Sequence, residues 1–187
     1  MKILLNEKKL LWEEIMDNNP LKIINLKNLD IDFTDKPIII GGMAMEYYGL
    51  RKHGDDIDFI VSNCDYLKLE TRYRNCRKDI WGDLGIRVNE YEMFRSIWKL
   101  DYTYFDNGTH EFDQYKIVSI DTLFRMQVFA IGSEINQYKE KHKNDLELIK
   151  QYYLNKYQNK EWVDFMNKNS DKYKKTENGT IINGDYY

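Results

Sequence analysis

Cysteine, proline and long apolar runs are all scarce in this chain of 187 residues. The two cysteines, Cys64 and Cys76, show no Cys-x-x-Cys spacing, so we expect neither a disulfide scaffold nor a zinc cluster. No run of 18 apolar residues occurs, and the N-terminal stretch meets charge after three apolar residues. We therefore expect a cytoplasmic protein that neither crosses a membrane nor carries a secretory signal.

Neither sign of charge dominates, because 28 Lys and Arg stand against 31 Asp and Glu, for a formal charge of −3. This balance argues against a protein that wraps a nucleic-acid backbone and leaves nucleic acid only as a locally bound substrate. A content of 42% hydrophobic and 32% charged residues is typical of a globular protein. The length predicts one domain with a helical appendage.

The hydrophobic pattern predicts a mixed α/β (α+β) fold, a small sheet flanked by helices with a helical C-terminal layer. The domain boundaries that we expect are an N-terminal helix and lead-in over 1–36, a core over 37–118, a helical layer over 119–173 and a loose tail over 174–187. Strands are predicted near 37–40, 56–61, 86–88, 98–105 and 115–118. Helices are predicted near 7–18, 44–48, 66–76, 120–130, 135–155 and 162–173, and 23–33 is ambiguous.

The clearest local signal is a buried strand, a glycine pair and a helix, followed by a second strand with two aspartates. Gly41 and Gly42 would let a phosphate approach backbone N–H groups closely. Asp56 and Asp58 stand two apart on the second strand, so their side chains share one face at a Cα separation of roughly 6.5 Å. Carboxylates so placed suit Mg²⁺ (or Mn²⁺) and a phosphoryl-transfer site.

A third carboxylate is expected from Asp101, which interrupts an apolar and aromatic run where an unpaired charge would be costly without a cation. The three predicted metal ligands and catalytic acids are therefore Asp56, Asp58 and Asp101. The triplet of residues 30–32 also reads Asp-Ile-Asp, but no glycine turn precedes it, and we interpret it as unrelated to the site.

The stretch IIIGGMAMEYYGLRKHGDDIDFIV, followed by WKLDYTYF, resembles the minimal nucleotidyltransferases of the DNA polymerase β superfamily. Within that superfamily it is most similar to the branch that includes the AbiEii-type toxin nucleotidyltransferases, and KEKHKND at 139–145 fits that branch's basic helical motif. The resemblance covers about 37–150. It implies metal-dependent transfer of a nucleoside monophosphate from an NTP to a hydroxyl. Relatives often carry Ser or Thr where this chain has Gly54.

Further site residues follow from the resemblance. It implies nucleotide-binding roles for Gly41, Gly42, Lys52 and Lys141, and supporting roles for Arg51, His53, His142 and Asp145, with Asp145 orienting Lys141. Two of these keep a plain alternative: Lys141 lies on what is also the wet face of an amphipathic helix, and His53 can be an ordinary solvated turn residue.

Several questions stay open at the level of sequence. The acceptor could be an RNA end such as that of tRNA, a protein or a small molecule, and the resemblance also allows a toxin role with an antitoxin-like protein partner. The alternative function is a catalytically silent module with the same fold that senses nucleotides or binds a protein. The aromatics of 98–105 suit sheet packing better than a base-stacking platform.

Overall fold

Short runs of β-branched and aromatic residues build a seven-stranded mixed sheet at the centre of this computed structural model. The structure describes residues 24–80, 83–132, 139–157 and 164. The helix expected over 7–18, nearly all of the one expected over 162–173, and the tail lie outside the described residues. The predicted α/β class is confirmed.

The sheet has the strand order β3-β4-β5-β2-β1-β9-β8. The pairs β2–β5 and β1–β9 are parallel, and the other neighbours are antiparallel. The strands are β1 (Ile38–Ile39), β2 (Ile57–Ile60), β3 (Arg77–Ile80), β4 (Asp83–Val88), β5 (Tyr91–Phe94), β8 (His110–Glu111) and β9 (Lys116–Ile117).

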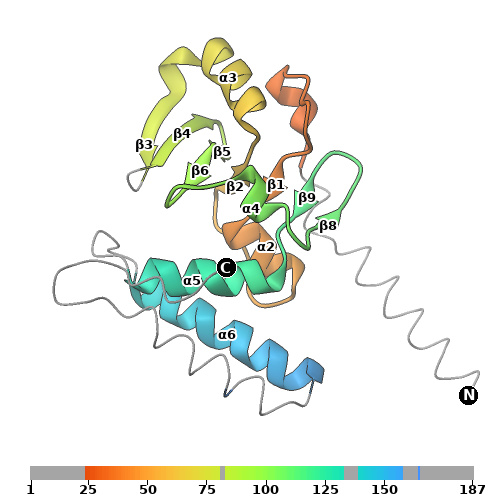
Figure 1. Ribbon diagram of the computed structural model, residues 1–187, viewed down its shortest axis with the longest axis vertical. Coiled ribbons are helices and arrows are strands. Elements are labelled where there is room, and N and C mark those ends of the chain that lie inside the picture. Colours follow the sequence, from red (N-terminus) through yellow and green to blue (C-terminus); the bar gives the residue numbers. More distant parts are fainter. Residues whose placement is uncertain (1–23, 81–82, 133–138, 158–163, 165–187) are drawn as a thin grey trace, which may run out of the picture.

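The helices cover two ends of this sheet (Figure 1). Helix α3 lies at one end, whereas α5 and α6 pack side by side at the other, with α2 between α5 and the strands. The α-helices are α2 (Gly41–Tyr47), α3 (Asn63–Arg72), α4 (Tyr102–Phe105), α5 (Ile120–Gly132) and α6 (Lys139–Tyr157), with 3-10 turns at Leu26–Leu29 and Arg74–Cys76. In the part of the chain that is described, no helix has the length and apolar character needed to span a bilayer.

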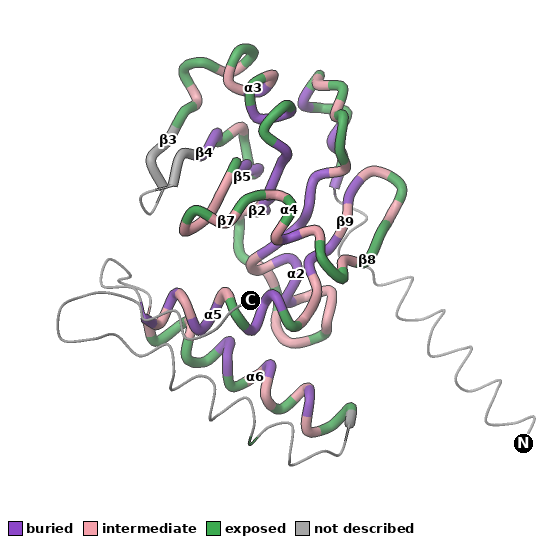
Figure 2. Tube along the Cα trace, in the orientation of Figure 1, coloured by how far each residue is buried: buried purple, intermediate pink, exposed green. Residues whose placement is uncertain are grey.

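Local chemistry explains where two of these helices begin. The Ser62 hydroxyl accepts a hydrogen bond from the backbone N–H of Asp65 and caps α3, and Ser119 does the same for Thr122 at the start of α5. The core runs through the central strands and the facing sides of α5 and α6, where buried residues alternate with exposed ones (Figure 2). The helical period predicted for the C-terminal layer is therefore confirmed.

The strand predicted over 98–105 is wrong. The chain instead forms a short hairpin of β6 (Ser96–Ile97) and β7 (Leu100–Asp101), and then α4. Trp98 and Lys99 make the turn, with φ of 51° and 67°, and the Asp101 carboxylate caps α4 by accepting from the backbone N–H of Thr103. The pattern also missed β5, which lies between β4 and β2 in the middle of the sheet.

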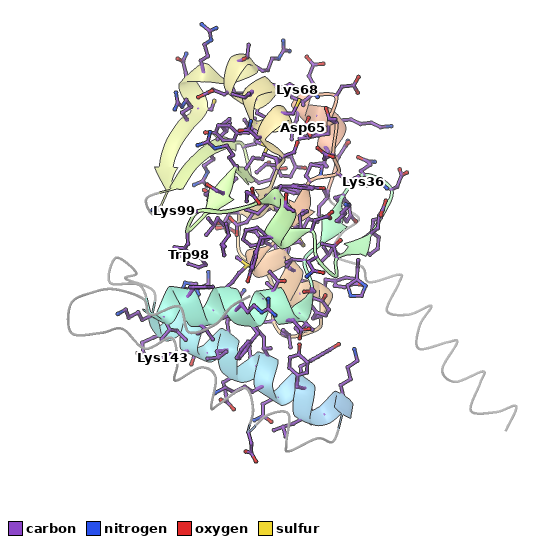
Figure 3. All side chains as sticks on the ribbon, in the orientation of Figure 1. Lys36, Asp65, Lys68, Trp98, Lys99 and Lys143 are labelled. Atoms are coloured by element: carbon purple, nitrogen blue, oxygen red, sulfur yellow. The ribbon has the colours of Figure 1, made fainter. Side chains whose placement is uncertain are left out.

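A buried carboxylate fastens the segment before β1 to α3. Asp65, with no exposed surface, accepts hydrogen bonds from the backbone N–H groups of Thr34 and Asp35 at 2.8 and 2.9 Å, and from Lys68 Nζ at 2.8 Å. The Ser62 hydroxyl donates to it as well, and Figure 3 shows Asp65 and Lys68 together on α3. Burial raises the pKa of Asp65, but these hydrogen bonds outweigh burial and hold it below the usual range.

We expect Asp65→Ala to lower the free energy of unfolding at pH 7 by about 3 kcal/mol, because the buried donors would lose their shared acceptor. Since the folded pKa is depressed, this stabilisation exists above the unfolded pKa of about 4 and disappears as the pH falls through the folded value. Urea denaturation at several pH values measures it. The control is Asp32→Ala, an exposed side chain whose removal should cost less than about 0.5 kcal/mol. Equal losses in both variants would contradict the assignment.

Candidate metal and nucleotide site

Three carboxylates meet where β2 and β5 begin. Asp56 precedes β2, Asp58 lies in β2 and Glu92 lies in β5, and parallel pairing sets Asp58 opposite Glu92. Each contributes one oxygen to a group whose members all lie within 4.8 Å of one another. Within the described ranges, no other group of three His, Cys, Asp or Glu side chains is arranged in this way. We call these three residues the acidic cluster.

The acidic cluster fits a divalent cation. Carboxylate oxygens are the hard ligands that Mg²⁺ and Mn²⁺ take, and three of them carry the charge that such an ion would neutralise. Burial, together with the charges of Asp56 and Glu92, raises the pKa of Asp58 to about 7, while Lys141 and Arg87 act in the opposite direction. The Arg87 Nη1 lies 2.9 Å from Glu92 Oε1 and offsets part of the repulsion.

Asp101 does not belong to this cluster, so its prediction as the third ligand is wrong. It is exposed and its carboxylate caps α4, because the run that contains it turns at Trp98 and Lys99 instead of continuing as a strand. Glu92 takes the third place. The signal that drew attention to Asp101, a carboxylate within an apolar and aromatic run, is also present at Tyr91–Phe94, and it could have pointed to Glu92.

The glycine pair lies directly against the cluster. Gly41 has a φ of 60°, and a Cβ at this position would overlap the Oδ2 atom of Asp58. A Cβ at Gly42 would lie 3.5 Å from Arg51 Nη1 and from the Cα of His53. The predicted neighbours of the site are thus brought together around α2.

Gly54 has a packing reason of its own. A Cβ at this position would lie 3.2 Å from Asp56 Oδ1, which is tighter than ordinary van der Waals contact. A Ser or Thr at this position would therefore press on a carboxylate of the acidic cluster.

The predicted basic residues divide into two groups. Arg51 is bound to Asp145 of α6 through Nε–Oδ1 at 2.6 Å and Nη2–Oδ2 at 2.8 Å, and its Nη1 donates to the carbonyl of Lys52. The hydrogen bond to Asp145 is the main cause that raises the Arg51 pKa. The expectation that Asp145 orients Lys141 is corrected, because its partner is Arg51. The side chains of Lys52 and Lys141 are exposed, and the charge of Lys141 acts on Asp58.

Each of the two predicted histidines has a partner. One carboxylate oxygen of Glu46, in α2, accepts the backbone N–H of His53 at 2.7 Å and also contacts the ring Nδ1. His142 Nδ1 lies 2.6 Å from Gln127 Oε1 of α5, and burial lowers the His142 pKa. His142 therefore joins α6 to α5, whereas His53 joins α2 to the loop that leads to the acidic cluster.

Glu92→Gln should weaken Mn²⁺ binding about tenfold or more, because an amide replaces one of three charged oxygen ligands. Asp101→Asn should leave the affinity unchanged, since that carboxylate lies outside the cluster. Calorimetric titration of Mn²⁺ into the purified variants measures both. A larger loss for Asp101→Asn than for Glu92→Gln would restore Asp101 as a ligand.

Asp58→Asn should stabilise the metal-free protein, and by about 2 kcal/mol more at pH 8 than at pH 5. The folded pKa of about 7 exceeds the usual 3.8, so the wild-type protein loses stability as the pH rises through this interval. Denaturation in EDTA measures the difference. Saturating Mg²⁺ should stabilise the wild-type protein at pH 8 and should have little effect on Asp58→Asn. If the difference in unfolding free energy between the two proteins does not change with pH, the electrostatic cause is refuted.

Comparison with known proteins adds no relative. No family model matches the sequence, and no curated protein matches it.

Proposed function

We propose that the protein transfers a nucleoside monophosphate from an NTP to a hydroxyl acceptor in a metal-dependent reaction. The observation that carries this proposal is the acidic cluster directly against Gly41, with Lys141 close enough to act electrostatically on Asp58. Three clustered acids without a cation repel one another, so cation binding is the simplest reason for the arrangement.

The surrounding residues suit this reaction. A divalent cation held by Asp56, Asp58 and Glu92 would neutralise charge on the transferring phosphate. Lys141 offers an exposed ammonium group for the triphosphate. Arg51, in contrast, donates two hydrogen bonds to Asp145. It therefore holds the loop before Asp56 in place, and these two donors are not available to a phosphate.

The rival function is a silent module that binds a nucleotide or a protein without reaction. Two features of the sequence favour it: Gly54, where members of the family that the sequence resembles often carry a hydroxyl, and the acidic overall charge of −3. A side chain at Gly54 would make a close contact with the Asp56 carboxylate, so the presence of glycine here can be explained by packing and does not indicate a loss of activity. The acceptor class, whether an RNA end, a protein or a small molecule, and a toxin role with an antitoxin-like partner stay predictions.

The proposal is tested with each of four labelled NTPs, Mg²⁺ or Mn²⁺, and total RNA, cell lysate protein or small-molecule hydroxyl acceptors. We expect label transfer and pyrophosphate release in the wild type, reduced at least about a hundredfold in Asp56→Asn and Asp58→Asn. Asp101→Asn is the matched control and should keep full activity, because Asp101 lies outside the cluster.

Thermal stability with and without NTP and metal separates the two functions. A folded-state ligand at a hundredfold excess over its dissociation constant stabilises by about 2.7 kcal/mol. A metal-dependent nucleotide shift without pyrophosphate release, with every acceptor class offered, would favour the silent module. Absence of both would refute nucleotide binding altogether.

A further inference from the structure

Asp101 caps α4 outside the acidic cluster, so it is not placed to accept a proton from an acceptor hydroxyl bound at the cluster. Asp56, Asp58 and Glu92 are the residues available to hold a metal ion. A carboxylate that binds a metal ion is a poor proton acceptor, so a general base would have to come from the residues around the cluster.

Glu46 and His53 form a pair with the geometry of an oriented base. A single oxygen, Glu46 Oε2, receives the backbone N–H of His53 and contacts its Nδ1. An ionised carboxylate can only accept, so Nδ1 is the donor in this contact, and Nε2 is the ring nitrogen that is left to take up a proton. Burial raises the pKa of Glu46, but the two bonds from His53 outweigh it and keep this carboxylate ionised.

The pair adjoins the loop that leads to Asp56. His53 stands three residues before Asp56 in the loop between α2 and β2, and its Cα packs against Gly42. The next residue, Gly54, closely approaches the Asp56 carboxylate. The His53 side chain retains 25% of its exposure, and no hydrogen bond to its Nε2 is found among the described residues.

We propose that His53 is the general base of the reaction and that Glu46 is its positioning residue; this inference rests on the proposed nucleotidyl transfer. The acceptor oxygen forms a bond to the α-phosphorus while its proton passes to His53 Nε2. The bond from the α-phosphorus to the bridging oxygen breaks, and its electron pair leaves on pyrophosphate. The imidazolium then returns its proton to water.

The alternative role of this pair is to hold the loop in place. His53→Asn separates the two roles, because the Asn amide nitrogen can replace Nδ1 as donor to Glu46 but no atom replaces Nε2. We expect this variant to lose about a hundredfold or more in kcat. Its thermal unfolding, its Mn²⁺ affinity and its nucleotide-induced stabilisation should match the wild type.

Two further variants complete the experiment. His53→Ala should be inactive and should regain label transfer when imidazole is added, because a free base can occupy the vacated space. His110→Asn is the matched control, an exposed histidine on β8, and should keep wild-type kcat.

The outcomes are distinct. If His53→Asn retains wild-type kcat while the wild type transfers label, His53 is not the base and nucleotidyl transfer stands. A variant that loses metal or nucleotide binding along with kcat also overturns the inference and assigns the pair to loop structure. If the wild type transfers no label to any acceptor, the proposed function itself fails and the base has no reaction to serve.

Discussion

Parallel pairing of β2 with β5 sets two carboxylates side by side, and the charged groups around them reduce the repulsion between these carboxylates only in part. Asp58 and Glu92 face each other across the pair, and Asp56 adds a third negative charge. Arg87 compensates Glu92 directly, and Lys141 acts on Asp58 from the helical layer. The compensation is partial, because the Asp58 pKa still lies near 7. The polypeptide thus retains an excess of negative charge that a cation would remove.

The helical layer contributes to the site and is more than an appendage. Arg51 and Asp145 join the loop before β2 to α6 by two short charge-assisted hydrogen bonds, and Asp145 is almost fully buried. His142 and Gln127 join α6 to α5, which packs on α2. These contacts connect α6 to α5, to α2 and to the loop before β2. The position of Lys141 relative to the acidic cluster therefore depends on how the helices pack against the sheet.

Much of the fold and two of the three members of the acidic cluster could be predicted from the sequence, because those features are local. Gly41, Asp56 and Asp58 lie within one unit of strand, helix and strand, and the two aspartates share one face of β2 by their spacing alone. Glu92 was missed because its role depends on which strands pair, and that information is not contained in either strand. Arg51 and Asp145, 94 residues apart, were both expected near the site, but their pairing could not be derived from a helical motif.

The wrong strand has a comparable cause. A tight hairpin with two left-handed residues usually announces itself by Gly, Asn or Asp, and here Trp98 and Lys99 occupy those positions. The Trp98 ring lies 5.7 Å from that of Phe129 in α5, a tertiary contact that no local pattern reveals. Figure 3 shows Trp98 on the side of the hairpin that faces α5.

The close approach of Gly41 to Asp58 has an evolutionary consequence. A side chain at 41 would displace the Asp58 carboxylate, so a substitution there disturbs the acidic cluster in addition to straining the backbone at its positive φ. If Asp58 were replaced first by a smaller residue, a side chain at position 41 would no longer overlap a carboxylate. Only the backbone strain of the positive φ would remain, and Asn or Asp tolerates this conformation better than other residues with a side chain. The two positions therefore form an ordered epistatic pair, in which decay of the carboxylate is expected to precede decay of the glycine.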